Sequence, residues 1–358
     1  MTTDSPSTLP GPGYHRANHY IPQGYLRQWA HDEARIWTYR TLVSHPGVRE
    51  WRSHSIKGIA NREHLYAQVS YGSISDLVER WLERHVDSPS AAALQRVAKE
   101  QRLSPSDWDC IFRFFACSQA RTPAYFLRAQ ARWTRELPEL MASSLKRTTR
   151  AIEEGTRLET PRGPPLGGTE VEPPIRVRLR PNKDGEGGVV EAIVLTGRRL
   201  WLTEIHRIAS HSYKNLRGLH WTILRAPLGR QWLTSDDPAI GARISQDRVV
   251  TYDGGPGILG SYLFMPLSPL HMLYARVGAR PQLKYTTMGD AEASFVQTCQ
   301  VKHAHRLVFA QAIDDWVQSI RPRVIDKNAH EHERGEWEKL HKEHSQAERD
   351  LEDDNTWL

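Results

Sequence analysis

A helix that is apolar on almost every side is the feature that most constrains how this chain can fold. It is expected to run from Trp108 to about Arg121. The apolar residues that cover most of its sides are Trp108, Ile111, Phe112, Phe114, Phe115 and Ala116. Ser104 supplies an N-cap and Pro105 a first-turn proline, which define its start. Because a helix without a polar face has to be buried, the sequence predicts one central core helix.

The patterns on either side of this helix predict a mixed fold. Residues 35–40 alternate polar and apolar side chains, which is typical of a strand, and helical spacing is found at 75–100 and 124–149. The later part reads mainly as strands, with helices expected at about 191–215 and 289–304. We therefore predict an α+β fold in which a helix-rich N-terminal half packs on a mostly antiparallel sheet from the C-terminal half.

The composition divides the chain into one domain and its flanking segments. Residues 1–13 are rich in Ser, Thr, Pro and Gly and are expected to form a flexible leader, since they lack the features of a signal peptide. A single α+β domain should span residues 14–321, with a Pro- and Gly-rich loop at 154–190 that contains a strand at 175–179. The charged tail at 322–358 is expected to be a solvated helix or a disordered extension.

Charge and cysteine content bound the partners and the compartment. Forty-eight basic and 42 acidic residues give a net charge of +6. This small excess of basic residues is compatible with nucleic acid as a partner. It is equally compatible with an arginine bias that has no functional cause. Three cysteines argue against a disulfide framework and for a reducing compartment. No segment is apolar over the roughly 18 residues that a membrane span needs, so we expect a soluble, cytoplasmic protein without a membrane partner.

Four short blocks place polar side chains beside backbone-fixing prolines. They are His19-Tyr20-Ile21-Pro22-Gln23 with Tyr25-Leu26-Arg27, then Arg121-Thr122-Pro123, then Thr234-Ser235-Asp236-Asp237-Pro238, and finally Pro266-Leu267-Ser268-Pro269. In order and spacing these blocks resemble the bacterial domain-of-unknown-function family 4238, over roughly residues 18–310. The resemblance implies a relationship at the level of the fold and brings no established activity with it.

The same blocks supply the candidate site residues. A histidine can act as a general acid or base because its unperturbed pKa lies near 6.5. Carboxylates in a turn after a strand are often catalytic, and arginine can grip a phosphate with two hydrogen bonds. As catalytic residues we predict His19, Asp236 and Asp237. As substrate-binding residues we predict Tyr20, Tyr25, Arg27, Arg121 and Ser235.

Each block also has a purely structural interpretation. The aromatic residues of the first block could be core packing, and the Thr-Ser-Asp-Asp-Pro block could be a turn whose side chains cap their own backbone. Arg121 could be a buried arginine bound to carbonyls or to one of the aspartates. No metal site is predicted, since the histidines of the tail alternate with charged residues. The chain has no Walker loop, cysteine-pair motif or Gly-x-Gly-x-x-Gly box, so its sequence indicates no cofactor.

Three functions remain open. The first is a nuclease-like phosphodiester hydrolase, metal-independent or Mg²⁺-dependent, with aromatic residues available for base stacking. The second is a non-catalytic module that binds nucleic acid or a protein partner. The third is a hydrolase of a small or sugar substrate with Asp236 or Asp237 as acid or base. The nuclease hypothesis requires His19, one of the two arginines and one of the two aspartates to lie in one cleft.

Overall fold

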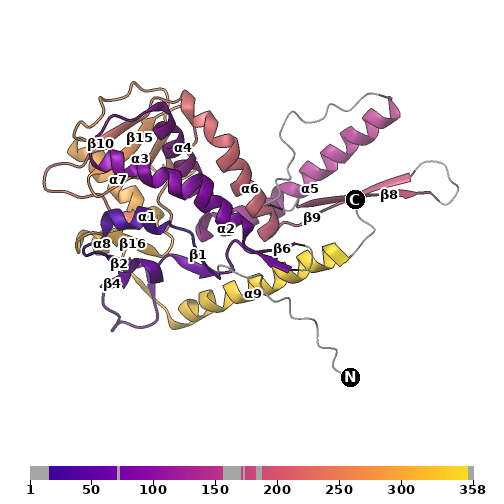
Figure 1. Cartoon of the computed structure of the whole chain (residues 1–358), viewed down its shortest axis with the longest axis horizontal. Helices are drawn as coiled ribbons and strands as arrows, with labels where there is room; N and C mark the ends of the chain where they lie inside the picture. Colours follow the sequence, from indigo (N-terminus) through magenta and orange to yellow (C-terminus); the bar gives the residue numbers. More distant parts are fainter. Residues whose placement is uncertain (1–15, 71–72, 156–170, 172–173, 183–187, 354–358) are drawn as a thin grey trace.

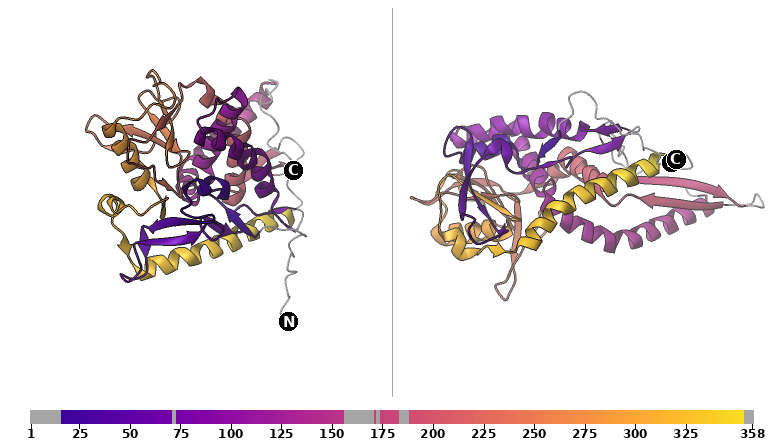
Figure 2. Two further views of the ribbon diagram at one scale, coloured as in Figure 1. Left: turned by 60° about the vertical axis from the view of Figure 1, so that its left-hand side comes forward. Right: turned by 90° about the horizontal axis from the view of Figure 1, so that it is seen from below.

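Two antiparallel sheets and a group of helices form the body of the molecule (Figure 1). The computed structural model describes residues 16–70, 73–155, 171, 174–182 and 188–353, so the predicted leader at 1–13 and much of the predicted loop lie outside the described residues. Helix α5 (Pro123–Glu153) and the hairpin of β8 (Ile175–Pro181) and β9 (Gly188–Val194) project together from one end (Figure 2). The strand expected at 175–179 is therefore confirmed. Within the described residues, no helix is long and apolar enough to cross a membrane.

Helix α4 (Pro105–Ala120) is the predicted core helix, and its start is fixed by a capping box. The Ser104 hydroxyl accepts a hydrogen bond from the Asp107 amide at 3.2 Å, and the Asp107 carboxylate accepts one from the Ser104 amide at 2.8 Å. This arrangement satisfies two backbone donors that the helix cannot pair itself. Ile111 and Phe115 are fully buried, and α4 contacts α3 (Ser88–Ala98), α6 (Arg198–Ser210) and the turn η4 (Ser212–Gly218).

The two larger sheets bring together strands that are far apart in the chain. One has the order β11 (Thr234–Ser235), β16 (Leu307–Ala310), β2 (Arg35–Arg40) and β4 (Trp51–Ser55). The other has the order β10 (Thr222–Arg225), β15 (His271–Arg276), β14 (Tyr262–Pro266), β12 (Ile240–Ile244) and β13 (Val250–Thr251). All of these pairings are antiparallel.

Shorter elements complete the described fold. Paired strands are β1 (Ala17–His19) with β5 (Asn61–Glu63), β6 (Gln68–Ser70) with β7 (Ser73–Ser75), and β3 (Leu42–Val43) with β17 (Val324–Ile325). The remaining helices are α1 (Gln23–Leu26), α2 (Leu77–Leu82), α7 (Asp290–His303), α8 (Trp316–Ile320) and α9 (Lys327–Asp353). Single turns are η1 (Arg27–Trp29), η2 (Ile56–Gly58) and η3 (Glu83–Asp87).

The predicted α+β class is confirmed, but the predicted division into a helical half and a sheet half is wrong. Strands β2 and β4 come from the first 55 residues and supply two of the four strands of one sheet. The helices are concentrated in the middle of the chain and are not confined to its N-terminal half. Helices α6, α7 and α9 lie in the C-terminal half. The division failed because β2 pairs with β16, more than 260 residues later, and local patterns carry no information on such partners.

The helix expected at about 191–215 begins later than predicted. Residues up to Val194 form β9, and α6 starts at Arg198 after Gly197. The run of β-branched residues before Val194 favours a strand, and the glycine then separates the two elements. The helical spacing that the prediction used belongs to α6 alone.

Most of the charged tail forms helix α9, as one of the two predicted alternatives required, but the helix is not simply solvated, because one face of it is docked on the domain (Figure 2). The Arg198 guanidinium binds the Glu348 carboxylate at 2.6 Å, and both side chains are at most 5% exposed. The same carboxylate accepts a hydrogen bond from the Val69 amide at 2.7 Å. A buried charge is stable only when it is paired and hydrogen-bonded, so this pair holds α9 in place.

A group of histidines lies between α9 and the domain. The rings of His64 and His341 stack with centroids 4.4 Å apart, and Arg198 donates a hydrogen bond to Nδ1 of His341 at 2.7 Å. Burial and the neighbouring charges of Arg198, His64, His344 and Arg349 lower the pKa of His341 to about 3. The imidazole is therefore neutral when α9 is docked.

Acid is expected to weaken the docking of α9. In the unfolded chain His341 titrates near pH 6.5, so between about pH 6.5 and about pH 3 the unfolded state binds more protons than the folded state. The contribution of neutral His341 to the stability of the folded state is complete above about pH 6.5. It is lost as the pH falls from about 6.5 to about 3. Urea unfolding at roughly pH 7 and pH 4.5 should show a smaller loss of stability for His341→Gln than for the wild type. Equal losses in both proteins would contradict this assignment.

Candidate functional site

The four sequence blocks meet in space, and hydrogen bonds between buried groups join them. Tyr25 is 1% exposed, and its hydroxyl lies 2.7 Å from the Thr234 hydroxyl and donates to the Pro266 carbonyl at 2.7 Å. One side chain thus connects the first, third and fourth blocks. Its ring packs against Trp29 and Phe114. The structure therefore places Tyr25 in the core, where burial raises its pKa.

Arg121 connects the second block to the first. Its guanidinium is 1% exposed and binds the Asp87 carboxylate at 2.6 Å and the His19 carbonyl at 3.0 Å. The Tyr66 hydroxyl donates back to the Arg121 carbonyl at 2.7 Å. Because its hydrogen-bonding groups face these partners, Arg121 is a buried link rather than an open anion-binding group. The partner is Asp87, a residue outside all four blocks.

Asp236 holds the start of β16. Its carboxylate accepts hydrogen bonds from the amides of His305, Arg306 and Leu307 at 2.8, 2.8 and 3.0 Å. The Asp236 amide in turn donates to the Leu307 carbonyl at 3.0 Å. Three backbone donors satisfy the charge of a carboxylate that is only 2% exposed.

Asp237, which is 1% exposed, connects the third block to the second. Its carboxylate accepts hydrogen bonds from the Thr122 hydroxyl at 3.2 Å and from Arg128 at 2.8 Å, and it lies 3.0 Å from Nε2 of His303. Burial alone would raise the pKa of this carboxyl, but His303 and Arg128 lower it overall. The Ser235 hydroxyl accepts hydrogen bonds from the Asp237 amide and from the Gln300 side chain.

His19 and Arg27 do not share a cleft with the aspartates. Nε2 of His19 lies 3.1 Å from the Lys57 carbonyl, and burial lowers the pKa of this imidazole. Arg27 is exposed on η1. The structure thus brings together most of the predicted residues as a hydrogen-bonded network, but only Tyr20 and Asp236 line a common cleft.

This cleft, which we call the Arg40 cleft, has a volume of about 260 Å³ and a wall in which polar and apolar residues are mixed. It lies where the ends of β2 and β5, the start of β16 and the N-terminal part of α9 meet. Its basic side chains are Arg40, Arg62, Arg306, His305 and His330. Its other polar side chains are Tyr20, Asn61, Asp236 and Glu333.

Protein groups already occupy the hydrogen-bonding positions of the two carboxylates of the cleft, although burial still raises the pKa of Asp236. Asp236 binds the three amides described above. Glu333 binds Arg306 at 2.7 Å and Arg62 at 3.5 Å. Burial alone would raise the pKa of Glu333, but the neighbouring His305 and Arg306 side chains lower it to about 2. Glu333 is therefore a carboxylate at neutral pH, and its charge is held by the arginines around it.

Arg40 is the arginine that this arrangement leaves without a hydrogen-bonded counterion, although the more distant charges of Asp236 and Glu333 act on it. Its side chain is half-buried, and among the described residues no hydrogen bond or ion pair joins it to the protein. Burial lowers its pKa from the usual range, which reflects the free-energy cost of removing a guanidinium from water. A partly buried, unpaired arginine facing a cleft is the chemistry of an anion-binding site.

His305 adds a second unused group to the same cleft. Its Nε2 is buried, has no hydrogen-bond partner among the described residues, and lies 3.6 Å from the nearer Glu333 oxygen, beyond hydrogen-bonding distance. The backbone amide of His305 is fixed by Asp236. The imidazole as a whole is 19% exposed and lines the cleft, and an accessible imidazole can exchange a proton with a ligand.

The sequence reasoning missed Arg40, His305 and Glu333. One signal was available for Arg40: in a strand that alternates inward and outward residues, it falls on the same side as Ile36, which is buried. Glu333 lies in the tail, whose charges suggested a solvated helix. No group of three or more His, Cys, Asp or Glu side chains among the described residues is placed to hold a metal ion.

Comparison with known proteins gave one match. Neither the curated proteins nor the solved structures include a chain that matches this one. The model of a family described as "Protein of unknown function (DUF4238)" matches residues 17–320. This range contains all four blocks and the strands and helices that they connect, and it confirms the predicted resemblance. The chain belongs to the DUF4238 family.

Proposed function

We propose that this protein is a phosphodiesterase that binds and cleaves single-stranded RNA at the Arg40 cleft. The observation that carries the proposal is the half-buried Arg40 guanidinium, which makes no hydrogen bond or close ion pair with the protein among the described residues. The cleft volume of about 260 Å³ suits one phosphate with part of its nucleotide rather than a folded polymer. Arg62 and Arg306 lie on the same wall and add to the positive potential.

The cleft holds groups for both proton transfers of RNA cleavage. In this reaction His305 takes the proton of a ribose 2′-hydroxyl, and the 2′-oxygen then attacks the adjacent phosphorus. His330, which lines the same cleft, gives a proton to the departing 5′-oxygen, so the products are a 2′,3′-cyclic phosphate and a 5′-hydroxyl. Arg40 stabilises the negative charge that develops on the phosphorus-bound oxygens. Glu333, 3.6 Å from His305, favours the protonated imidazole that forms during the reaction.

This proposal keeps the nuclease hypothesis and moves its roles to other residues. Tyr20 and Asp236 remain at the cleft, the first as a wall and the second as the anchor of the His305 backbone. His19, Arg121 and Asp237 support the site from the buried network. His305 and His330 carry the proton transfers, because the hydrogen-bonding groups of the carboxylates are occupied.

The test is a cleavage assay on end-labelled single-stranded RNA and on DNA of the same sequence, with Mg²⁺ or with EDTA. RNA should be cut to a cyclic phosphate in both buffers, and DNA should stay intact because it lacks the 2′-hydroxyl. Arg40→Met is expected to lower kcat/KM by about 100-fold and His305→Gln by about 100-fold or more. Arg217→Met is the matched control, since Arg217 is an exposed arginine paired with Asp109 outside the cleft.

Circular dichroism must first show that each variant is folded. Absence of RNA cleavage by the folded wild type would overturn the catalytic part of the proposal. Salt-dependent RNA binding that Arg40→Met abolishes would then identify a binding module. Cleavage that Arg40→Met and His305→Gln leave unchanged would place the site elsewhere.

A further inference from the structure

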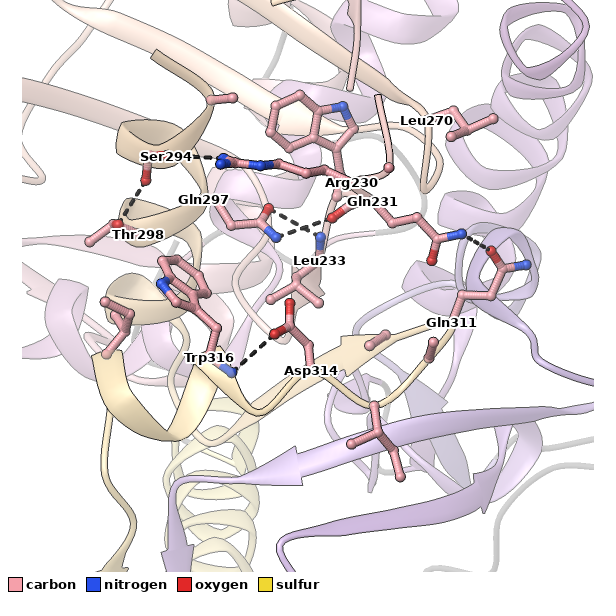
Figure 3. Close-up of a pocket in the computed structure, with 17 residues that line it drawn as sticks. Arg230, Gln231, Leu233, Leu270, Ser294, Gln297, Thr298, Gln311, Asp314 and Trp316 are labelled. Atoms are coloured by element: carbon pink, nitrogen blue, oxygen red, sulfur yellow. Dashed lines mark hydrogen bonds between the residues drawn. The ribbon is translucent and has the colours of Figure 1, made fainter. Parts of the chain in front are cut away.

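A second, larger cavity of about 1010 Å³ lies on the other side of the sheet that borders the Arg40 cleft. Leu307 lines the cleft, whereas Ala310, three residues later on β16, lines the cavity. Alternate residues of a strand face opposite sides, so these two residues point away from each other. The cavity is therefore independent of the proposed RNA site. Its walls are residues 229–233, helix α7 and residues 310–320 (Figure 3).

One wall of the cavity is held rigid by side-chain amides. Gln297 of α7 donates to the Gln231 carbonyl at 3.1 Å and accepts from the Leu233 amide at 3.3 Å. The Gln231 side chain reaches across to the Gln311 side chain at 2.9 Å (Figure 3). These contacts satisfy the backbone of this segment, so a ligand would meet side chains rather than a free strand edge. The shape of the cavity is thus largely preformed.

One polar group at the cavity has an unused hydrogen-bonding position among the described residues. Asp314 uses one carboxylate oxygen to accept from the Trp316 amide at 3.0 Å, and no hydrogen bond joins its other oxygen to the protein. A free carboxylate oxygen calls for a ligand group that can donate a hydrogen bond.

The cavity carries little net charge. Arg230 donates to the Ser294 hydroxyl at 3.0 Å and lies 3.8 Å from the Asp290 carboxylate. Asp314 is the carboxylate among the lining residues, and it balances Arg230. Unlike the Arg40 cleft, this cavity therefore offers no excess charge to an anion or a cation. The remaining polar groups are hydroxyls and amides.

We propose that this cavity binds a neutral saccharide. Each hydroxyl of a sugar can donate a hydrogen bond, which matches the free carboxylate oxygen of Asp314. The amide and hydroxyl side chains of α7 add further sites of both kinds. The ring of Trp316 is partly exposed and lies with Asp314 on one side of the cavity, opposite Arg230 and Gln297 (Figure 3). Its flat apolar face suits the C–H face of a pyranose ring.

Titration calorimetry and tryptophan fluorescence test the proposal on the full chain. The probes are maltotriose, cellotriose and the β-1,4-linked trimer of N-acetylglucosamine, each at up to about 10 mM, with glucose 6-phosphate as a charged comparison. At least one neutral trimer should bind with a Kd at or below about 1 mM. Trp316→Ala and Asp314→Asn should each raise that Kd about tenfold or more. Asp315→Asn, at the exposed neighbouring residue, should leave it unchanged.

The outcomes separate clearly. Binding of a neutral trimer that both cavity variants weaken supports the assignment. No binding of any of the three trimers to the folded wild type overturns it, and so does binding that Trp316→Ala leaves unchanged. Tighter binding of the charged sugar than of every neutral one would also overturn it. RNA cleavage is measured separately, so failure here leaves the Arg40 proposal intact.

Discussion

Arg121→Met is expected to lower the free energy of unfolding by about 3–5 kcal/mol. The substitution keeps an unbranched side chain but leaves the Asp87 carboxylate and the His19 carbonyl without their donor. Arg121 is 1% exposed, so bulk water cannot take its place there. Removing one partner of such an ion pair costs more than the pair itself contributes, because the Asp87 carboxylate, 21% exposed, stays largely buried without its donor.

Urea unfolding followed by circular dichroism measures this effect, with Arg27→Met as the control. Arg27 belongs to the same group of blocks but is exposed, so its substitution should change stability by about 0.5 kcal/mol or less. Similar losses for both variants would show that Arg121 is not the link we describe. The comparison also tests whether the blocks mark a structural network, since a substrate-binding arginine would lower activity without this loss of stability.

The local elements of the fold could be predicted because each has a local cause. Ser104 and Asp107 form the capping box that starts α4. Residues 35–40, whose alternation of polar and apolar side chains predicted a strand, form β2. Pro123 separates α4 from α5, where a break was expected. What the sequence could not show is which strands pair. The partners of β2 are β4, nearby, and β16, in the last sixth of the chain.

The candidate site illustrates the same limit. The blocks were recognisable as a set, and their residues do converge, but the chemistry of each depends on what surrounds it. Asp237 is neutralised by Arg128 and His303, and neither pairing is visible from spacing. Arg40 is notable for what is missing around it, which only a structure can reveal. Glu333 and His330 reach the cleft because α9 docks on the domain.

Asp236→Asn is expected to lower the free energy of unfolding by about 2–4 kcal/mol. The carboxylate uses one oxygen for the His305 amide and the other for the amides of Arg306 and Leu307. An asparagine has a single carbonyl oxygen, so it can serve only one of these two sides. Its amide group would then face backbone N–H groups that also need acceptors. At least one buried donor is left unsatisfied.

The same variant separates a structural from a catalytic role for Asp236. Urea unfolding of Asp236→Asn is compared with that of Asp247→Asn, at an exposed residue where little change is expected. A large loss for the first alone supports the anchoring role, and RNA cleavage should then fall only because His305 is less well positioned. If Asp236→Asn were as stable as the wild type but inactive, the carboxylate itself would be the reacting group. Asp236 lines the same cleft as His305 and His330. It would then carry out one of the two proton transfers that are assigned to these histidines, and their roles would have to be reassigned.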